Sequence, residues 1–463
     1  MDFSAANTDL WNGIIQLGLL AAMLLLANVL RRKLAFFRKS LMPTAVLAGF
    51  LALIFRVAGL LKLELGLMEM ITYHTIAIGF IAMSLQVPDK NEAVAKGDFT
   101  AAKSGALIVS TYLIQGLVGL IITICLAHTV MPGLFKAAGI LLPMGYGQGP
   151  GQANNVGSTY ATLGFAGGQS FGLSIAAMGF LCACIVGVIY LNILKRRGKI
   201  AVADRKAVSG QVTVDDFQNE NEIPISESVD KFSVQFALIL LIYLATFLVS
   251  KGLTALLATY LPGLSKTVGA LVWGFNFIIG SLLAIVCRNL FNLLTKAGIM
   301  TRQYPNNYLL SRISGTAFDF MVITGIAAID FKDISSLWLP FVLLSVAGGV
   351  VTLIWLQWLC KKIYPRYYYE GLLSMYGMLT GTISSGVLLL REIDPGFKTP
   401  AASNLLTGSS FAIVFGIPML LLIGLAPESD AMLYLCLGLI IVYMSALTLF
   451  MLLVKRKKTA SAD

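Results

Sequence analysis

The sequence predicts an all-α membrane protein with about 11 transmembrane helices. They form two inverted five-helix repeats, each with a Gly-rich re-entrant hairpin, plus one extra C-terminal helix. Three observations lead to this fold class. The chain of 463 residues is 57% hydrophobic and only 12% charged, whereas soluble domains carry about 25% charged residues. Its apolar residues gather in runs of the length that spans a bilayer. Its Lys and Arg residues lie in short clusters between those runs, where they set the orientation of membrane helices.

The spans follow from the apolar runs taken in order along the chain. Two further stretches, 137–164 and 371–392, have the right length but are rich in Gly, Ser, Thr, Asn and Gln. The eleven predicted spans are 12–30, 42–60, 71–87, 104–129, 170–194, 233–250, 267–287, 308–329, 335–360, 404–426 and 430–454.

The basic residues predict how these spans are oriented. The first basic cluster, 31–39, follows the first span, so we expect a multi-pass protein with its N-terminus outside and its C-terminus in the cytoplasm. If the two polar stretches return to the side from which they enter, the cytoplasmic loops hold 25 of the 34 Lys and Arg residues and the outside loops hold five. If 137–164 crossed the membrane instead, the basic loop after residue 194 would face outside. The charge pattern therefore favours two re-entrant hairpins.

The only long polar segment, 195–231, predicts a cytoplasmic linker between two halves. The first half, 1–194, has five spans and a hairpin at about 137–164. The second half, 232–426, has five spans and a hairpin at about 371–392, and 427–463 adds an extra transmembrane helix and a basic tail. Because each half has an odd number of spans, the second half is upside down. The hairpins therefore enter from opposite sides and meet near the midplane, as in inverted-repeat transporters.

The first hairpin has five glycines and one proline within residues 144–157, a composition that predicts broken, non-helical backbone. Such backbone is tolerated at membrane depth where protein or a watery cavity surrounds it. Its carbonyls suit Na⁺ and its amide groups suit a carboxylate. A water-exposed loop is the alternative. The candidate binding residues here are Gly145, Gly147, Gln148, Gly149, Gly151, Gln152, Asn154 and Asn155.

The second hairpin is rich in hydroxyl side chains, whose oxygens suit a hard alkali cation. Ser and Thr also allow close helix packing, so each of them has a structural alternative. The candidate residues are Tyr376, Gly377, Thr380, Gly381, Thr382, Ser384 and Ser385.

Asp319 lies in the middle of the eighth predicted span, and a carboxylate inside a membrane is by default a functional candidate. Arg312 lies two helical turns earlier on the same face. The two could pair, or Asp319 could bind Na⁺ or carry a proton. A Na⁺ site formed by Asp319, Thr380, Thr382 and Ser384 is the metal hypothesis.

Other function classes fit the sequence less well. The net charge of +11 does not indicate nucleic acid as a partner, because the basic residues lie between spans, next to membrane lipid. The sequence shows no nucleophile–base pair and no cluster of metal ligands, since Cys182 and Cys184 alone have such spacing and no His lies near them, and its two histidines lie far from the hairpins. We therefore expect no enzyme and no organic cofactor. A channel or a non-transporting membrane receptor of the same fold remains an alternative.

Both hairpins resemble motifs of the bacterial sodium/glutamate symporter family. Residues 144–149, Met-Gly-Tyr-Gly-Gln-Gly, resemble a Gly-Gly-His-Gly-Thr-Gly-type run, and residues 376–382 resemble a second run rich in Gly, Ala and Thr. The similarity extends from Arg38 to about Gly424. The chain departs from the family at Tyr146 and Gln148, where the family has His and Thr. It also departs at Ser384, which is commonly Pro, in the long linker and in the extra span.

This resemblance implies a function and an assembly. It implies a homodimer in the cell inner membrane that uses Na⁺ as coupling ion and works by alternating access of elevator type. It implies symport of glutamate or a related small carboxylate, that is, a small anionic solute. The departures lie where substrate would bind, so another dicarboxylate or an amino acid is the alternative substrate.

Overall fold

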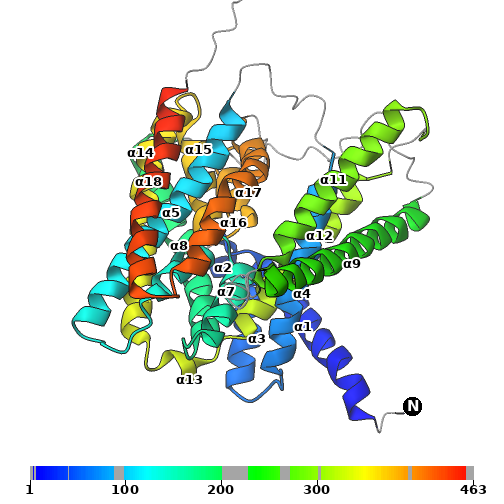
Figure 1. Cartoon of the computed structure of the whole chain (residues 1–463), viewed down its shortest axis with the longest axis horizontal. Coiled ribbons are helices and arrows are strands. Elements are labelled where there is room, and N and C mark those ends of the chain that lie inside the picture. Colours follow the sequence, from blue (N-terminus) through cyan, green and yellow to red (C-terminus); the bar gives the residue numbers. More distant parts are fainter. Residues whose placement is uncertain are drawn as a thin grey trace, which may run out of the picture. The chain divides into compact units, whose positions relative to one another are not determined.

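A computed structural model describes residues 7–39, 41–87, 99–200, 228–260, 272–300, 304–394 and 399–454, together with Ser4 and Gly269 (Figure 1). Every regular element in these residues is helical, which confirms an all-α protein. Ten helices are long and apolar enough to cross a membrane, which confirms a multi-pass membrane protein. They are α1 Thr8–Lys33, α4 Leu65–Leu85, α5 Thr100–His128, α8 Gly168–Arg196, α9 Ser228–Tyr260, α11 Asn276–Lys296, α12 Asn307–Ala327, α14 Trp338–Ile363, α17 Ala401–Leu425 and α18 Asp430–Leu453.

The remaining helices are short. The predicted span 42–60 forms only α3, Thr44–Val57, with 14 residues. At 1.5 Å per residue it is about 21 Å long, less than the roughly 30 Å of a hydrocarbon core. Helix α4 begins earlier than the span predicted at 71–87, and α11 begins later than the span predicted at 267–287. The other short helices are α2 Ala35–Lys39, η2 Lys136–Ile140, α6 Leu141–Tyr146, α7 Pro150–Thr162, α13 Phe331–Ile334, α15 Tyr368–Thr380 and α16 Ile383–Arg391.

The chain forms two compact units, each made of separate segments. The first unit contains residues 1–72, 97–207 and 322–463, and the second contains 73–96 and 208–321. These units differ from the predicted halves, because each half contributes to both units. Most of the predicted linker, residues 201–227, and the basic tail beyond residue 454 lie outside the described residues.

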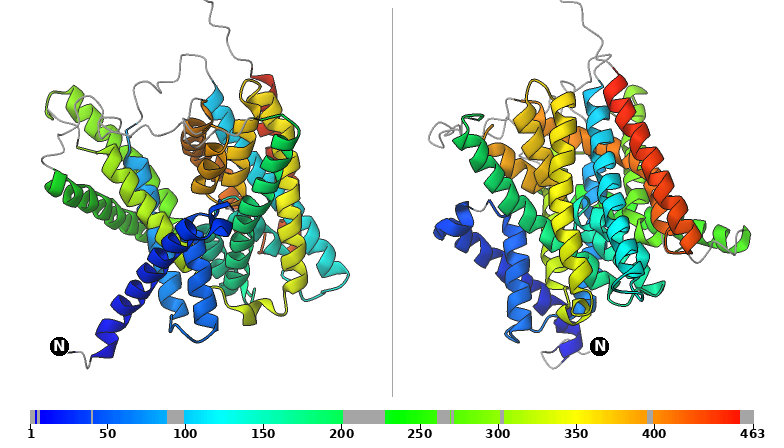
Figure 2. Two further views of the ribbon diagram at one scale, coloured as in Figure 1. Left: turned by 180° about the vertical axis from the view of Figure 1, so that it is seen from behind. Right: turned by 90° about the vertical axis from the view of Figure 1, so that its left-hand side faces the viewer.

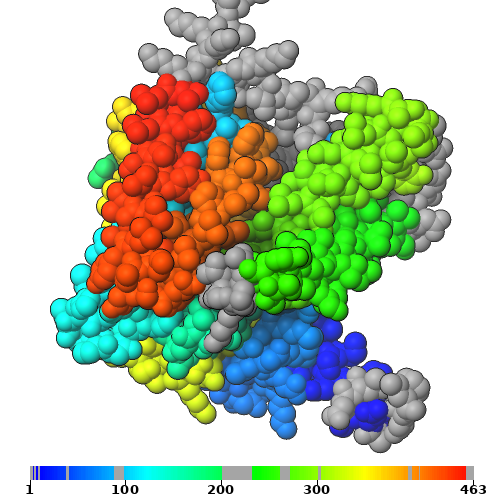
Figure 3. Space-filling view, in the orientation of Figure 1, coloured from blue at the N-terminus to red at the C-terminus, as the bar shows by residue number. Residues whose placement is uncertain are grey.

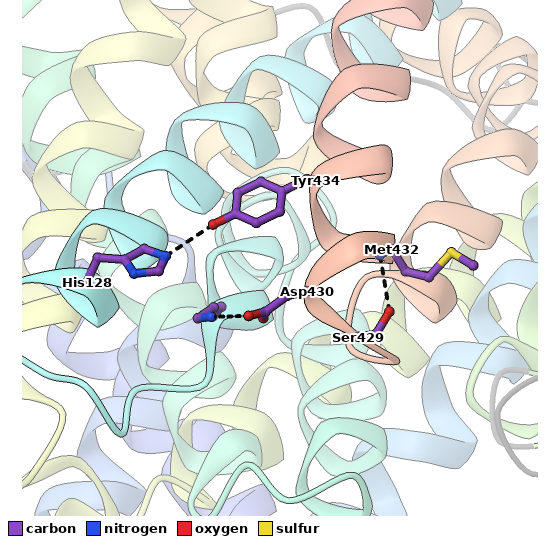
Figure 4. Close-up of polar contacts among 6 residues, drawn as sticks. His128, Ser429, Asp430, Met432 and Tyr434 are labelled. Atoms are coloured by element: carbon purple, nitrogen blue, oxygen red, sulfur yellow. Dashed lines mark hydrogen bonds and ion pairs between the residues drawn. The ribbon is translucent and has the colours of Figure 1, made fainter.

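In the first unit, α5 is the central helix and packs against α14, α17 and α18 (Figures 1 and 2). Glycines allow its closest contacts: a Cβ atom added to Gly119 would lie 2.1 Å from the carbonyl oxygen of Gly139 in η2. Polar contacts join the extra C-terminal helix α18 to the end of α5 and to the start of η2 (Figure 4). His128 Nε2 lies 3.1 Å from the Tyr434 hydroxyl, and Lys136 forms an ion pair with Asp430 at 2.5 Å.

The second unit is built from α9, α11 and the parts of α4 and α12 that belong to it. Helices α9 and α11 pack side by side on its surface (Figure 3). Its core contains Ile81, Ala82, Leu85, Ile239, Ile242, Ala284, Leu310 and Ile313. Arg288 ties α11 to the end of α4, because its Nη1 donates to the carbonyls of Ser84 and Gln86 at 3.1 and 2.8 Å.

Candidate functional site

The first Gly-rich stretch folds back on itself along helix α8 of the first unit. A Cβ atom added to Gly172 would lie 2.6 Å from the carbonyl oxygen of Ala153 in α7 and 3.4 Å from Leu141 in α6. Both arms therefore lie against the same level of α8. Further along α8, Gly145 packs against Ala176. Helices α6 and α7 are thus the two arms of a helical hairpin whose tip points toward the middle of α8.

The break between these arms covers only residues 147–149. Gly149 has a φ of 83°, in the left-handed region that favours glycine. Pro150 then occupies the first position of α7, where its fixed φ fits a helix and its missing N–H is not needed. The prediction that residues 144–157 are non-helical is therefore wrong for most of them, and Gly151, Gln152, Asn154 and Asn155 lie on a 13-residue helix.

The second Gly-rich stretch forms a matching hairpin, with α15 and α16 as arms and a break at Gly381 and Thr382. A Cβ atom added to Gly377 would lie 2.8 Å from the Cα atom of Gly386. This close approach brings the two arms together. Residues from both arms, Leu373 and Leu389, pack in one cluster with the C-terminal part of α8.

The two tips meet beside Gly179, in the twelfth position of the 29-residue helix α8. A Cβ atom added there would lie 2.4 Å from the Thr380 carbonyl oxygen and 3.1 Å from the Tyr146 ring. A Cβ atom added to Gly149 would lie 3.8 Å from the Gly381 carbonyl oxygen and 3.9 Å from Thr382 Cγ2. The first hairpin comes from the N-terminal end of α8 and the second from its C-terminal end. The structure therefore brings the two candidate stretches together.

Two helix N-termini and two helix C-termini converge at this meeting point. Helix α7 begins at Pro150 and α16 begins at Ile383, each directly after its tip. Their free N–H groups and positive dipole ends favour an anion. Helices α6 and α15 end there, at Tyr146 and Thr380. Their carbonyl oxygens favour a cation. The tips can therefore hold both charges of an ion pair without a charged side chain.

Several polar side chains on the hairpins are buried without partners. Gln152, in the first turn of α7, is 1% exposed, and neither atom of its amide has a hydrogen-bond partner among the described residues. The Ser385 hydroxyl is also buried and unpartnered there, and it lies 2.9 Å from where a Cβ atom of Gly381 would be. Each such group costs about 1–3 kcal/mol. Unmet groups beside a break in the backbone are typical of a site that binds a ligand.

The other predicted residues occupy varied surroundings. Within the hairpins, Gln148 and Thr382 are half-buried and Ser384 is exposed. The Thr380 hydroxyl donates to the Tyr376 carbonyl at 2.7 Å, within its own helix. The remaining candidates on the hairpins are buried: Gly145, Gly147, Gly149, Gly151, Asn154, Asn155, Tyr376, Gly377 and Gly381.

Asp319 and Arg312 do not belong to the unit that carries the hairpins. Both lie on the part of α12 assigned to the second unit, and both are exposed. The sequence left open whether the two form a pair, and no ion pair joins them in the described part of the chain. Arg312 instead lies over the Tyr308 ring, 5.0 Å from its centroid. Of the four residues predicted to bind Na⁺, Thr380 is the last residue of α15 and Thr382 lies in the break of the second hairpin.

The sequence interpretation missed a polar chain that leads to the first hairpin. Gln169 Nε2 donates to Asn154 Oδ1 at 2.8 Å, and the Gln169 side chain also hydrogen-bonds the Glu69 carboxylate. Ser170 donates to Asp333 Oδ2 at 2.8 Å. The span predicted at 71–87 does not include Glu69, which lies in the second turn of α4.

Gln115 of α5 was also missed. Its Nε2 donates to the Thr352 hydroxyl at 2.7 Å and to the Leu379 carbonyl at 3.0 Å, directly before the second tip. A glutamine near the centre of a predicted span was the signal that could have identified it.

No protein-family model matches the chain, and no curated protein sequence matches it.

Proposed function

We propose that the protein is a Na⁺-coupled symporter for glutamate or a related small carboxylate, with its binding site where the two hairpin tips meet. The observation that supports this most is the contact of the tips beside Gly179, where both hairpins have broken backbone. Broken helices meeting near the membrane midplane are the usual binding site of secondary transporters. A membrane anchor or a receptor does not need two helical hairpins with opposed breaks in their backbone.

The membrane topology is part of the proposal. Because the hairpins approach from opposite ends of α8, each enters and leaves on its own side of the membrane, the first from outside and the second from the cytoplasm. The basic residues at the C-terminal end of α8, Lys195 and Arg196, then lie in the cytoplasm, in agreement with the positive-inside rule. The N-terminus lies outside, and the two halves form inverted repeats.

The chemistry of the tips supports an anionic solute together with a cation. The carboxylate binds the N-terminal N–H groups of α7 and α16, with the unpartnered amide of Gln152 as a further donor. Na⁺ binds oxygens at the second tip, where carbonyls and the Thr382 hydroxyl are available. Bound Na⁺ neutralises the anion and orders the tips, which raises solute affinity. By linkage the solute raises Na⁺ affinity equally.

The division into two units supports alternating access of the elevator type. The unit with both hairpins carries solute and Na⁺ across the membrane, and the second unit serves as scaffold in a homodimer of the inner membrane. This elevator arrangement moves the complete site instead of opening gates on either side of it.

Uptake of labelled glutamate and related carboxylates into proteoliposomes tests the proposal. We expect uptake to require an inward Na⁺ gradient, and Ser385→Ala to reduce it because a buried hydroxyl beside the tip is lost. Ser281→Ala is a matched control, since that hydroxyl is equally buried and unpartnered but lies in the second unit. Uptake that follows a proton gradient and ignores Na⁺ contradicts the coupling. Equal effects of both variants contradict the site.

A further inference from the structure

The second unit contains a half-open cavity of about 500 Å³ between α4, α9 and α11. Its volume lies in the range of small-molecule sites, roughly 300–1,000 Å³. On α9, Tyr243, Thr246 and Ser250 recur at helical spacing and face it together. The described residues that line it are Tyr73, His74, Leu240, Tyr243, Leu244, Thr246, Phe247, Ser250, Trp273 and Asn276. All of them belong to the second unit, so this cavity is separate from the hairpins.

One side of the cavity is polar and incompletely hydrogen-bonded. Asn276 Nδ2 donates to the Tyr243 hydroxyl at 3.4 Å, and that hydroxyl lies 2.7 Å from His74 Nδ1. Asn276 Oδ1 and the Ser250 hydroxyl, however, are buried and have no partner in the described part of the chain. Asn276 is 4% exposed and Ser250 is fully buried. A ligand with hydroxyl groups can donate to Asn276 Oδ1 and exchange a hydrogen bond with Ser250.

The other side of the cavity is apolar and opens to the surface of the unit. Leu240 and Leu244 are 44% and 56% exposed. The Trp273 ring packs 5.7 Å from the Phe247 ring, and its position is fixed because Tyr73 donates to the Trp273 carbonyl at 2.8 Å. Exposed apolar residues on a membrane-spanning helix face acyl chains. A ligand here therefore has an apolar body as well as a polar end.

The lining also indicates the charge of the ligand. No Lys, Arg, Asp or Glu is among the described residues that line the cavity. Among these residues a phosphate or carboxylate would find no fixed countercharge, so its desolvation cost would be high.

We propose that this cavity binds a neutral membrane lipid with a hydroxyl-bearing head, of the acylglycerol type. The head lies against Ser250 and Asn276, and the acyl chain leaves past Leu240 and Leu244. The site is independent of transport, and its occupancy stabilises the second unit.

Native mass spectrometry of the delipidated protein with a monoacylglycerol tests the proposal. The methyl ester of the same fatty acid is the matched ligand, because it has the same chain but no hydroxyl group. We expect one saturable monoacylglycerol adduct per chain and weak binding of the ester. Ser250→Ala and Asn276→Ala should each weaken binding about fivefold, and the double variant about 25-fold.

Ser281→Ala is the matched protein control, because its buried, unpartnered hydroxyl is on α11 but does not line the cavity. It should bind the lipid like the unaltered chain, and unfolding temperatures without lipid show that every variant is folded. Equal binding of the ester and the monoacylglycerol overturns the proposal in favour of an apolar groove. Adducts on monomers but none on dimers overturn it in favour of a subunit interface. The absence of any monoacylglycerol adduct also overturns the proposal.

Discussion

Replacing Gly179 by alanine should separate the two hairpin tips. The added Cβ atom would lie 2.4 Å from the Thr380 carbonyl oxygen, whereas ordinary contacts begin near 3.4 Å. One tip must therefore move by about 1 Å. Overpacking of this kind lowers the free energy of unfolding by about 1–3 kcal/mol. A displacement of this size in a binding site can reduce turnover by about 100-fold. We expect Gly179→Ala to lower both the unfolding temperature and the initial rate of uptake.

Gly438→Ala is the control for this variant. Gly438 lies inside α18 of the same unit, and no atom lies within 4 Å of its added Cβ. Alanine there should be neutral or stabilising by up to about 1 kcal/mol, because it favours the helix. Unfolding temperatures measured in detergent and uptake measured in proteoliposomes compare the two variants. If Gly179→Ala unfolds and transports like Gly438→Ala, the tips do not meet at this helix.

Three further changes have distinct expected outcomes. Gln152→Leu removes a buried amide that has no partner among the described residues. Thermal unfolding should therefore show unchanged or increased stability, while uptake falls at least about tenfold. Loss of stability with normal uptake would show that the amide has a structural role. Gln169→Leu leaves Asn154 Oδ1 without its donor and should destabilise the protein by about 1–3 kcal/mol in denaturant unfolding; an unchanged midpoint contradicts this. Asp430→Ala breaks an exposed ion pair with Lys136 and should change the free energy of unfolding by less than about 1 kcal/mol. A larger loss of stability would contradict this and show that the pair anchors α18.

The sequence predicted the membrane fold well because its signals are strong. Ten of eleven apolar runs form long helices, since a spanning helix must be apolar over its whole length. The Gly-rich composition also identified the two stretches that meet. It overstated their irregularity, because Pro150 begins a helix when it stands at the first position. Composition alone does not show where a proline falls relative to a helix start.

Other features depend on contacts that the sequence does not display. Asp319 was predicted to be a functional residue because a carboxylate is costly inside a membrane. It lies, however, outside the unit that contains the hairpins. Gln115 and Gln169 gain their roles from partners hundreds of residues or several turns away. His74 lies near the start of the span predicted at 71–87, but it stands in the middle of α4 and lines the cavity of the second unit. When a predicted span begins a few residues away from the observed helix, residues inside that helix are assigned to its ends, and the sites that they form are missed.

Cross-linking of the tips tests the central claim most directly. Gly149→Cys and Thr382→Cys, in a chain whose six native cysteines are replaced, place thiols on two groups that nearly touch. The cysteine at position 149 must adopt a positive φ with an extended ψ, a region that is almost exclusive to glycine and costs roughly 1–3 kcal/mol, so each single variant must first retain uptake. We predict that the pair cross-links in the membrane, that this abolishes Na⁺-driven uptake, and that a reductant restores it. Two thiols that react with a small maleimide but never with each other would contradict the claim.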